Sequence, residues 1–354
     1  MRKILIILFA VLFSNAFAQV KIDTTKVEEE EDYSQYADVE TTTSTVKRYC
    51  SQKIVGLSPA KLISIGFDFV GNNGLTSDSI GSYFDRNSGI GSNTGFRFAA
   101  NFPVISNNKV ILNLGVNYLD FKYSLADASN YLNPLNNSLA KYGLRSYGAN
   151  ATLFKPLNEK RFIIAQFSFD ANSSSPIDEF NSNFVKVSGA LIYGLKPHER
   201  RQYGFGITRT YRGGGINYLP VVLYNYTFVN KKWGIEMLLP ARANVRYTFN
   251  ARNMLFAGFE VEGNSYALSR IKKDYGLPYN NLQLHRSEIR PRITYEFSLY
   301  KFFWLSLQAG YRLNYKFNVD EGDNYKTISD KPYIMENTLK GSYYFNISLN
   351  LVSP

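Results

Sequence analysis

The sequence predicts an all-β fold: an antiparallel transmembrane β-barrel of about twelve strands, with fourteen as the alternative, behind a disordered N-terminal tail. The first observation is residues 341–351, where apolar or aromatic residues alternate with Ser, Tyr and Asn. Side chains on a strand point alternately to opposite faces, so this strand has one apolar and one polar face. The second is that the same pattern recurs along the chain. The third is a mean hydropathy of −0.23 beside 16% aromatic residues, as expected when half of each strand faces a polar lumen.

Residues 1–18 are expected to be a signal peptide. Arg2 and Lys3 precede an apolar run over 4–13, and Ala16-Phe17-Ala18 forms a small-x-small cleavage site. No later run is long and apolar enough for a transmembrane helix. We therefore expect an exported protein of the outer membrane of a Gram-negative bacterium.

Residues 19–58 are expected to be an acidic, mostly disordered tail in the periplasm. Residues 19–45 hold two Lys against eight Asp or Glu, a net charge of −6, whereas the chain from residue 46 onward carries +15. Such a segment buries too little apolar surface to offset its ordering entropy. Its charge suggests a plug held at the basic barrel mouth by electrostatics; the alternative is a free spacer or a handle for a periplasmic partner. Cys50 is expected to be an incidental thiol in this linker, and nucleic acid is excluded as a partner of an exported chain.

The barrel is expected over 59–354. Twelve stretches alternate with period two and are expected to be strands: 63–69, 96–102, 110–118, 147–153, 163–169, 185–193, 203–211, 222–228, 255–261, 289–299, 303–315 and 341–351. Short links near 106–108, 156–159, 197–200 and 300–301 alternate with long ones over 71–94, 124–144, 172–183, 268–284 and 318–339. Outer-membrane barrels have short periplasmic turns and longer external loops, so both termini should be periplasmic and the strand count even.

The segment 229–253 is ambiguous. Twelve strands result if it holds no spanning strand, and fourteen if Pro240 marks a turn between two more strands. Proline removes a ladder hydrogen bond, which argues against a single strand through it.

Several short motifs resemble a known family: Lys155-Pro156-Leu157-Asn158, Tyr218-Leu219-Pro220, Trp233 followed by Leu239-Pro240, and Gly263-Asn264-Ser265-Tyr266. They are similar to an uncharacterised family of outer-membrane barrel proteins, known as a domain of unknown function. The resemblance implies a β-barrel in the outer membrane and transfers no activity or site residue.

A charge cluster is expected in the lumen. The inward set on the strand near 286–296, with its neighbours on either side, is Glu260, Glu262, Arg286, Glu288, Arg290, Arg292, Glu296, Arg312 and Lys316. Opposite charges on adjacent strands pair across a sheet. One interpretation is a salt-bridge lattice that fills a narrow barrel, which is favoured because barrel interiors commonly hold paired charge. The other is an electropositive constriction that selects anions.

His285 and Ser287 share a strand face, a spacing similar to that of the outer-membrane phospholipase family. That family follows its serine with Asn-Gly, whereas Glu288-Ile289 follow here, and the pattern places no asparagine beside the histidine. We therefore expect no enzyme, with lipid hydrolysis by this pair as the third hypothesis.

The most favoured function is a pore or transport channel with a charged lumen, and the alternative is a non-conducting structural or interaction barrel. Expected partners are outer-membrane lipid, the barrel assembly machinery and small anionic solutes. No cofactor or metal is expected, because the sequence has no Cys/His cluster and no phosphate-binding glycine loop.

Overall fold

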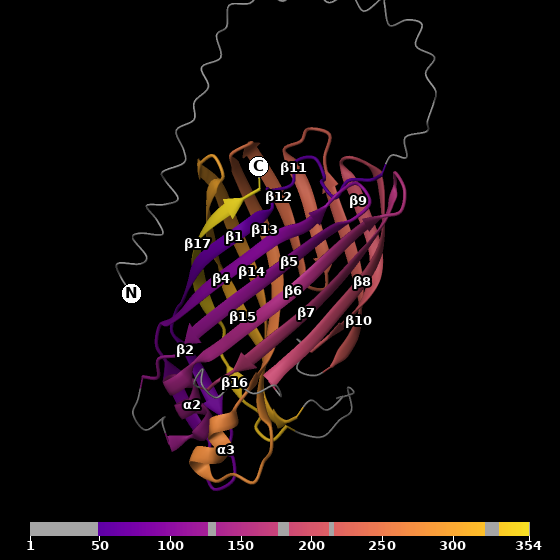
Figure 1. Cartoon of the computed structure of the whole chain (residues 1–354). Coiled ribbons are helices and arrows are strands. Elements are labelled where there is room, and N and C mark those ends of the chain that lie inside the picture. The colour runs from indigo at the N-terminus through magenta and orange to yellow at the C-terminus, as the bar shows by residue number, and fades with distance from the viewer. Residues whose placement is uncertain (1–48, 127–131, 176–183, 212–215, 323–332, 354) are drawn as a thin grey trace, which may run out of the picture. The chain divides into compact units, whose positions relative to one another are not determined.

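A computed structural model describes residues 49–126, 132–175, 184–211, 216–322 and 333–353, which belong to one compact unit. Within these residues, fourteen antiparallel strands close into a barrel (Figure 1). In barrel order they are β1 (Lys61–Val70), β17 (Ser342–Val352), β15 (Phe303–Glu321), β14 (Leu282–Tyr300), β13 (Asn253–Ala267), β12 (Arg242–Asn250), β11 (Trp233–Leu239), β10 (Asn217–Thr227), β9 (Arg201–Thr210), β8 (Val185–His198), β7 (Arg161–Ser173), β6 (Leu144–Pro156), β5 (Ile111–Lys122) and β4 (Asn93–Ser106).

The favoured count of twelve strands is wrong, and the alternative of fourteen is confirmed. The ambiguous segment holds two short strands, β11 and β12, which pair with each other from Trp233↔Tyr247 to Leu238↔Arg242. Pro240 lies in the two-residue turn between them. Because proline has no N–H to donate, it ends β11 rather than interrupting a longer strand.

The outward faces of the strands are apolar and exposed. Phe205, Phe169 and Ile207 are each more than half exposed although they sit mid-strand. On β1, β4, β5 and β6, the rings of Phe67, Phe96, Tyr118 and Tyr147 follow one another with centroid separations of 5.3, 6.1 and 5.0 Å. An exposed apolar and aromatic outer face is typical of a barrel surrounded by lipid. No helix among the described residues is long and apolar enough to cross a membrane.

The two ends of the barrel differ. At the turn end, links as short as 251–252 and 301–302 join the strands, and β1 begins and β17 ends there (Figure 1). At the loop end lie a three-stranded sheet and two helices, which occupy links expected to be long and polar. These elements are β2 (Asn73–Ser77), β3 (Arg86–Ile90), β16 (Thr338–Leu339), α2 (Pro134–Tyr142) and α3 (Ser269–Tyr275).

Local signals explain both helices. The side chain of Asn133 caps α2 by accepting hydrogen bonds from the N–H groups of Leu135 and Asn136, and Pro134 occupies the first turn, where no donor is needed. Gly276 ends α3 in a left-handed conformation.

A buried apolar core joins these elements to the barrel strands at the loop end. Among its members are Leu135 and Leu139 of α2, Ile271 of α3, Leu75 of β2, Phe121 of β5 and Phe317 of β15. The end of β13 also reaches β7, where the N–H of Ser174 donates to the carbonyl of Ala267 at 2.9 Å. This end of the lumen is therefore covered by a packed cap.

The structure describes ten residues of the expected tail. The tail was expected to run to residue 58, but residues 49–58 pack against the turn end of the barrel, with Cys50 and Ile54 buried. Cys50, expected to be an incidental thiol in a linker, is buried against the barrel. The remaining residues of the expected tail and the signal peptide, 1–48, lie outside the described residues.

Candidate functional site: the charged barrel interior

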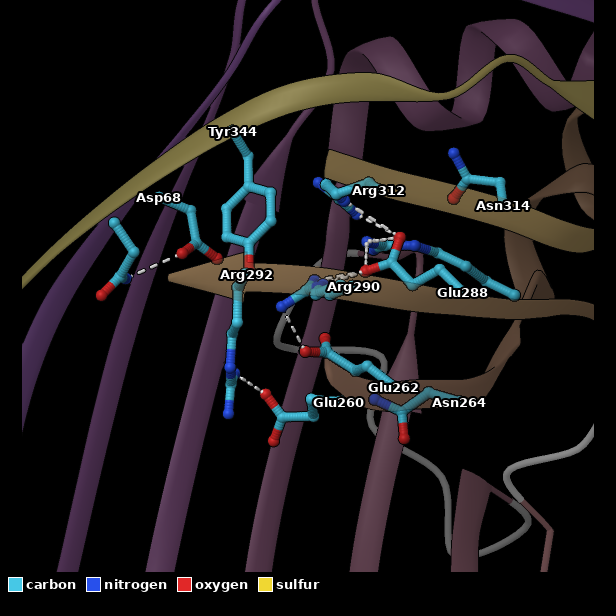
Figure 2. A network of polar contacts seen from close by, with 12 residues as sticks. Asp68, Glu260, Glu262, Asn264, Glu288, Arg290, Arg292, Arg312, Asn314 and Tyr344 are labelled. Atoms are coloured by element: carbon cyan, nitrogen blue, oxygen red, sulfur yellow. Dashed lines mark hydrogen bonds and ion pairs between the residues drawn. The ribbon is translucent and has the colours of Figure 1, made fainter. Parts of the chain in front are cut away.

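Glu288 is the centre of the lumen cluster. Its carboxylate is fully buried and contacts three guanidinium groups: Nη2 of Arg286 at 3.0 Å, Nη2 of Arg312 at 2.7 Å, and Arg290 (Figure 2). All three arginines are nearly inaccessible to solvent. A buried carboxylate is stable as an ion only when paired and hydrogen-bonded, and this one accepts from three cations.

Glu262 is a second centre, directly opposite Glu288 on the neighbouring strand β13. Like charges facing each other across a sheet repel. Arg290 removes this conflict because it contacts both carboxylates, with its Nη1 2.6 Å from Oε2 of Glu262.

The network then crosses the interior. Arg97 of β4 places Nη2 3.1 Å from Oε2 of Glu262 and its Nε 2.5 Å from Oδ2 of Asp68 on β1. Asn346 of β17 donates to the other oxygen of Asp68 at 2.8 Å. Six strands (β1, β4, β13, β14, β15 and β17) thus contribute to one connected set of contacts, much of which Figure 2 shows.

Aromatic rings cover the cations. Phe121, which points inward from β5, lies under Arg286 and Arg312 at 5.2 and 4.9 Å from ring centroid to guanidinium carbon. Arg290 lies 5.5 Å from the ring centroid of Tyr344 on β17. Such cation–π contacts strengthen when water is excluded, and Phe121 is almost completely buried. The interior is filled at this level.

The structure places the remaining predicted cluster residues at the margin of this network. Arg292 pairs with Glu260 across β14 and β13. Glu296, further toward the turn end, contacts Nζ of Lys61 at 2.6 Å and accepts from Ser306 at 3.2 Å. Eight of the nine predicted residues are therefore divided among a central network, the adjacent pair Arg292–Glu260 and the contact of Glu296 with Lys61.

Lys316 is not part of the network. The β14–β15 pairing shifts between Ser287 and Glu288, so that Tyr315 is an extra residue in β15 and Lys316 lies opposite Ser287. A bulge of this kind reverses which residues face inward beyond it. Phe317 consequently lies opposite Arg286, and the ammonium of Lys316 lies over the ring of Tyr333 at 5.1 Å.

The bulge also corrects the expectation about His285. The sequence places no asparagine beside it, but Asn318 lies opposite His285 in the pairing because of the shifted register. His285 shares a hydrogen bond of 2.8 Å with Ser265 of β13. His285 and Ser287 are 4% and 0% exposed, so neither is presented to lipid at the barrel surface.

The contributors absent from the predicted set include Asp68, Arg97 and Phe121, besides Asn346 and Tyr344 of β17. Each lies on the inward face of its own strand, and the alternation assigns Asp68 and Arg97 to a polar face. The missing information is that β4 and β5 face β13, β14 and β15 across the barrel.

The charges of the network and the adjacent Arg292–Glu260 pair nearly cancel. Five guanidinium groups (Arg97, Arg286, Arg290, Arg292 and Arg312) face four carboxylates (Asp68, Glu260, Glu262 and Glu288). The arrangement is a paired lattice with a surplus of one positive charge.

The sequence profile of the family described as a domain of unknown function, DUF6268, matches residues 96–352. The chain belongs to this family. The resemblance drawn from the short motifs is thereby confirmed. The family match contains every network residue in Figure 2 except Asp68, and it excludes β1 and the segment before it. No curated protein sequence matches the chain.

Solved structures with a similar fold are described as channels, transporters and porins. The COG4313 outer membrane channel from Pseudomonas putida F1 is 12% identical, with 84% of this chain and 97% of that chain covered and a TM-score of 0.38. The Pseudomonas putida toluene transporter TodX is 11% identical, with 86% and 95% covered and a TM-score of 0.34. The KdgM porin in complex with oligogalacturonate is 8% identical, with 82% and 99% covered and a TM-score of 0.33.

Between the two ends, polar side chains line the inner wall of this family member. Asn101 and Asn150 lie over Gly115, and Asn117 and Asp170 lie over Gly148, where a Cβ atom would collide with them. Gln166 is exposed although it points inward, and Thr152 and Asn244 are half-buried. Solvent therefore reaches the inner wall at this level.

Proposed function

We propose that the protein is a gated channel for small hydrophilic solutes in the outer membrane of a Gram-negative bacterium. The observation that carries this proposal is Gln166, an inward-facing side chain at mid-barrel that remains exposed to solvent. A closed barrel with a solvent-reached polar interior and an apolar outer face has the construction of a porin. The expected signal peptide and the even strand count support this location.

The lining supports a solute class. The amides of Asn101, Asn117, Asn150 and Gln166 donate and accept hydrogen bonds without adding charge. The nearby arginines are paired with carboxylates, so strong anion selection by a ring of free positive charge is not supported. We propose neutral or weakly anionic hydroxyl-rich solutes.

Conductance in a planar bilayer tests the proposal, with the reversal potential measured in a KCl gradient. The wild type should conduct with weak anion preference. Arg242 is exposed at the inner start of β12, opposite Glu260, so Arg242→Glu should shift the reversal potential toward cation selectivity. Arg252→Glu makes the same charge change in a turn at the barrel rim, and it should leave the reversal potential unchanged.

The second candidate is a non-conducting structural or interaction barrel. The buried Glu288 network and the loop-end cap favour it, because together they fill part of the interior near the loop end. Absence of conductance in all variants would support this candidate and contradict the channel. A lipid hydrolase is not supported, since His285 and Ser287 are buried.

A further inference from the structure

The chain segment before β1 is packed within the turn-end mouth of the barrel. Cys50 lies in an apolar cluster with Phe154, Phe162 and Ile192, which point inward from β6, β7 and β8. Phe154 and Phe162 are fully buried, and their rings stack with centroids 5.2 Å apart. The alternation had assigned a polar lumen to these strands, but here the interior is apolar and the segment covers it.

Hydrogen bonds fix the segment to two turns. The N–H of Cys50 donates to the carbonyl of Asn158 in the β6–β7 turn at 3.0 Å, and that of Val55 donates to the carbonyl of Glu199 in the β8–β9 turn, also at 3.0 Å. Gly56, at a positive φ of 85°, then redirects the chain.

Lys196 holds the middle of the segment. Its ammonium, on a side chain that is 6% exposed, donates to the carbonyl of Ser51 at 3.0 Å, to Oγ of Ser51 at 2.8 Å and to the carbonyl of Lys53 at 2.5 Å. A buried ammonium must be hydrogen-bonded, and these three acceptors all belong to the segment. A buried donor in the barrel thus meets two backbone carbonyls and one hydroxyl of the segment.

We propose that residues 49–58 are the gate of the turn end, an inference that rests on the proposed channel function. In the closed state the segment covers the inward apolar cluster and binds Lys196. Opening requires the segment to withdraw, which exposes Phe154 and Phe162 to water, so the closed state is the resting one. The gate is held by apolar burial and hydrogen bonds. It therefore differs from an electrostatic plug formed by the acidic residues 19–45, which high salt would weaken.

Single-channel recordings of the mature full-length chain test the gate. Deletion of 49–56 should raise the mean conductance at least threefold, by the same factor at low and high salt. Deletion of 20–45 is the matched control and should leave conductance unchanged. A salt-sensitive increase on deletion of 20–45, without an effect of deleting 49–56, would overturn the gate in favour of the electrostatic plug.

A reversible lock provides a second measurement in case the deletion fails to assemble. In Ile192→Cys, oxidation should join the new thiol to Cys50, which lies in the same cluster, and abolish openings until a reductant is added. The same substitution combined with Cys50→Ser should not respond to oxidant. Conductance unaffected by a disulfide shown to form would overturn the gate.

The two proposals fail in different ways. If the wild type conducts as freely as the 49–56 deletion, the gate is wrong and the channel stands. If neither the wild type nor the 49–56 deletion conducts, and reduced Ile192→Cys does not conduct either, the channel proposal is wrong. The gate proposal, which depends on it, is then wrong as well.

Discussion

Arg97 on β4 and Glu262 on β13 are separated by four intervening strands, yet Nη2 of the arginine lies 3.1 Å from Oε2 of the glutamate. The contact spans the interior and ties opposite walls of the barrel together. With Phe121 on the β5 side and Glu288 on the β14 side, it explains why the lumen is filled near the loop end.

Glu288→Gln should destabilise the barrel strongly. The substitution leaves Arg286, Arg290 and Arg312 buried without the carboxylate they share, and breaking one side of a buried ion pair costs about 3–5 kcal/mol. The temperature at which the folded band disappears on gels measures the effect. Glu260→Gln is the control, because Glu260 is about one-third exposed and pairs only with Arg292 among the ion pairs described here. Equal losses for both variants would contradict the central role of Glu288.

Ile293→Arg should impair assembly much more than Thr294→Arg. Ile293 is 57% exposed on the outward face, whereas Thr294 points inward beside it. An arginine on the lipid face near the bilayer centre costs roughly 2–4 kcal/mol, while a lumen arginine stays hydrated. The folded fraction after refolding into lipid vesicles measures the difference, and similar yields would show that the two faces are assigned incorrectly.

Surface labelling should distinguish the two barrel ends. In a Cys50→Ser background, a membrane-impermeant maleimide added to intact cells should label Lys273→Cys on α3. It should not label Lys109→Cys at the β4–β5 turn until the outer membrane is permeabilised. Outer-membrane barrels place their long loops outside the cell and their short turns in the periplasm, so only the loop-end position should be reached from outside. The reverse labelling pattern would overturn the orientation.

The thiol of Cys50 should react slowly with maleimide at pH 7.5. Burial raises the pKa of this thiol, although the nearby Lys196 opposes the shift, so the reactive thiolate is scarcer than for a free cysteine. The rate should rise in urea and in Lys196→Met, which releases Ser51 and Lys53 from the ammonium. Lys160→Met, at an exposed turn position, is the control. A fast rate in the folded wild type would show that residues 49–58 do not stay packed.

Much of the fold followed from the sequence because side-chain alternation is a local property of an extended chain. The inward placement of Arg286, Glu288, Arg290 and Arg312 needs only the period of two and the apolar face opposite. The same reasoning could not decide whether 229–253 holds two strands or none. The reason is that β11 has seven residues and β12 nine, and neither carries a long alternating pattern.

Lys316 and Asn318 show the limit of the alternation rule. A single extra residue at Tyr315 reverses the inward face beyond it, and the two-residue period contains no sign of the bulge. The burial of Cys50 shows the same limit, because its partners Phe154, Phe162 and Ile192 are more than one hundred residues away in the chain.

The sequence by itself determined the barrel class, the apolar outer face, the even strand count and the inward placement of Arg286, Glu288, Arg290 and Arg312. Only the tertiary structure decided that there are fourteen strands, that Arg97 and Phe121 meet those charges, and that residues 49–58 fill the turn-end mouth. The physical reason is that strand alternation depends on neighbours one and two residues away. Contacts across a barrel depend on how many strands close it and on the stagger between them.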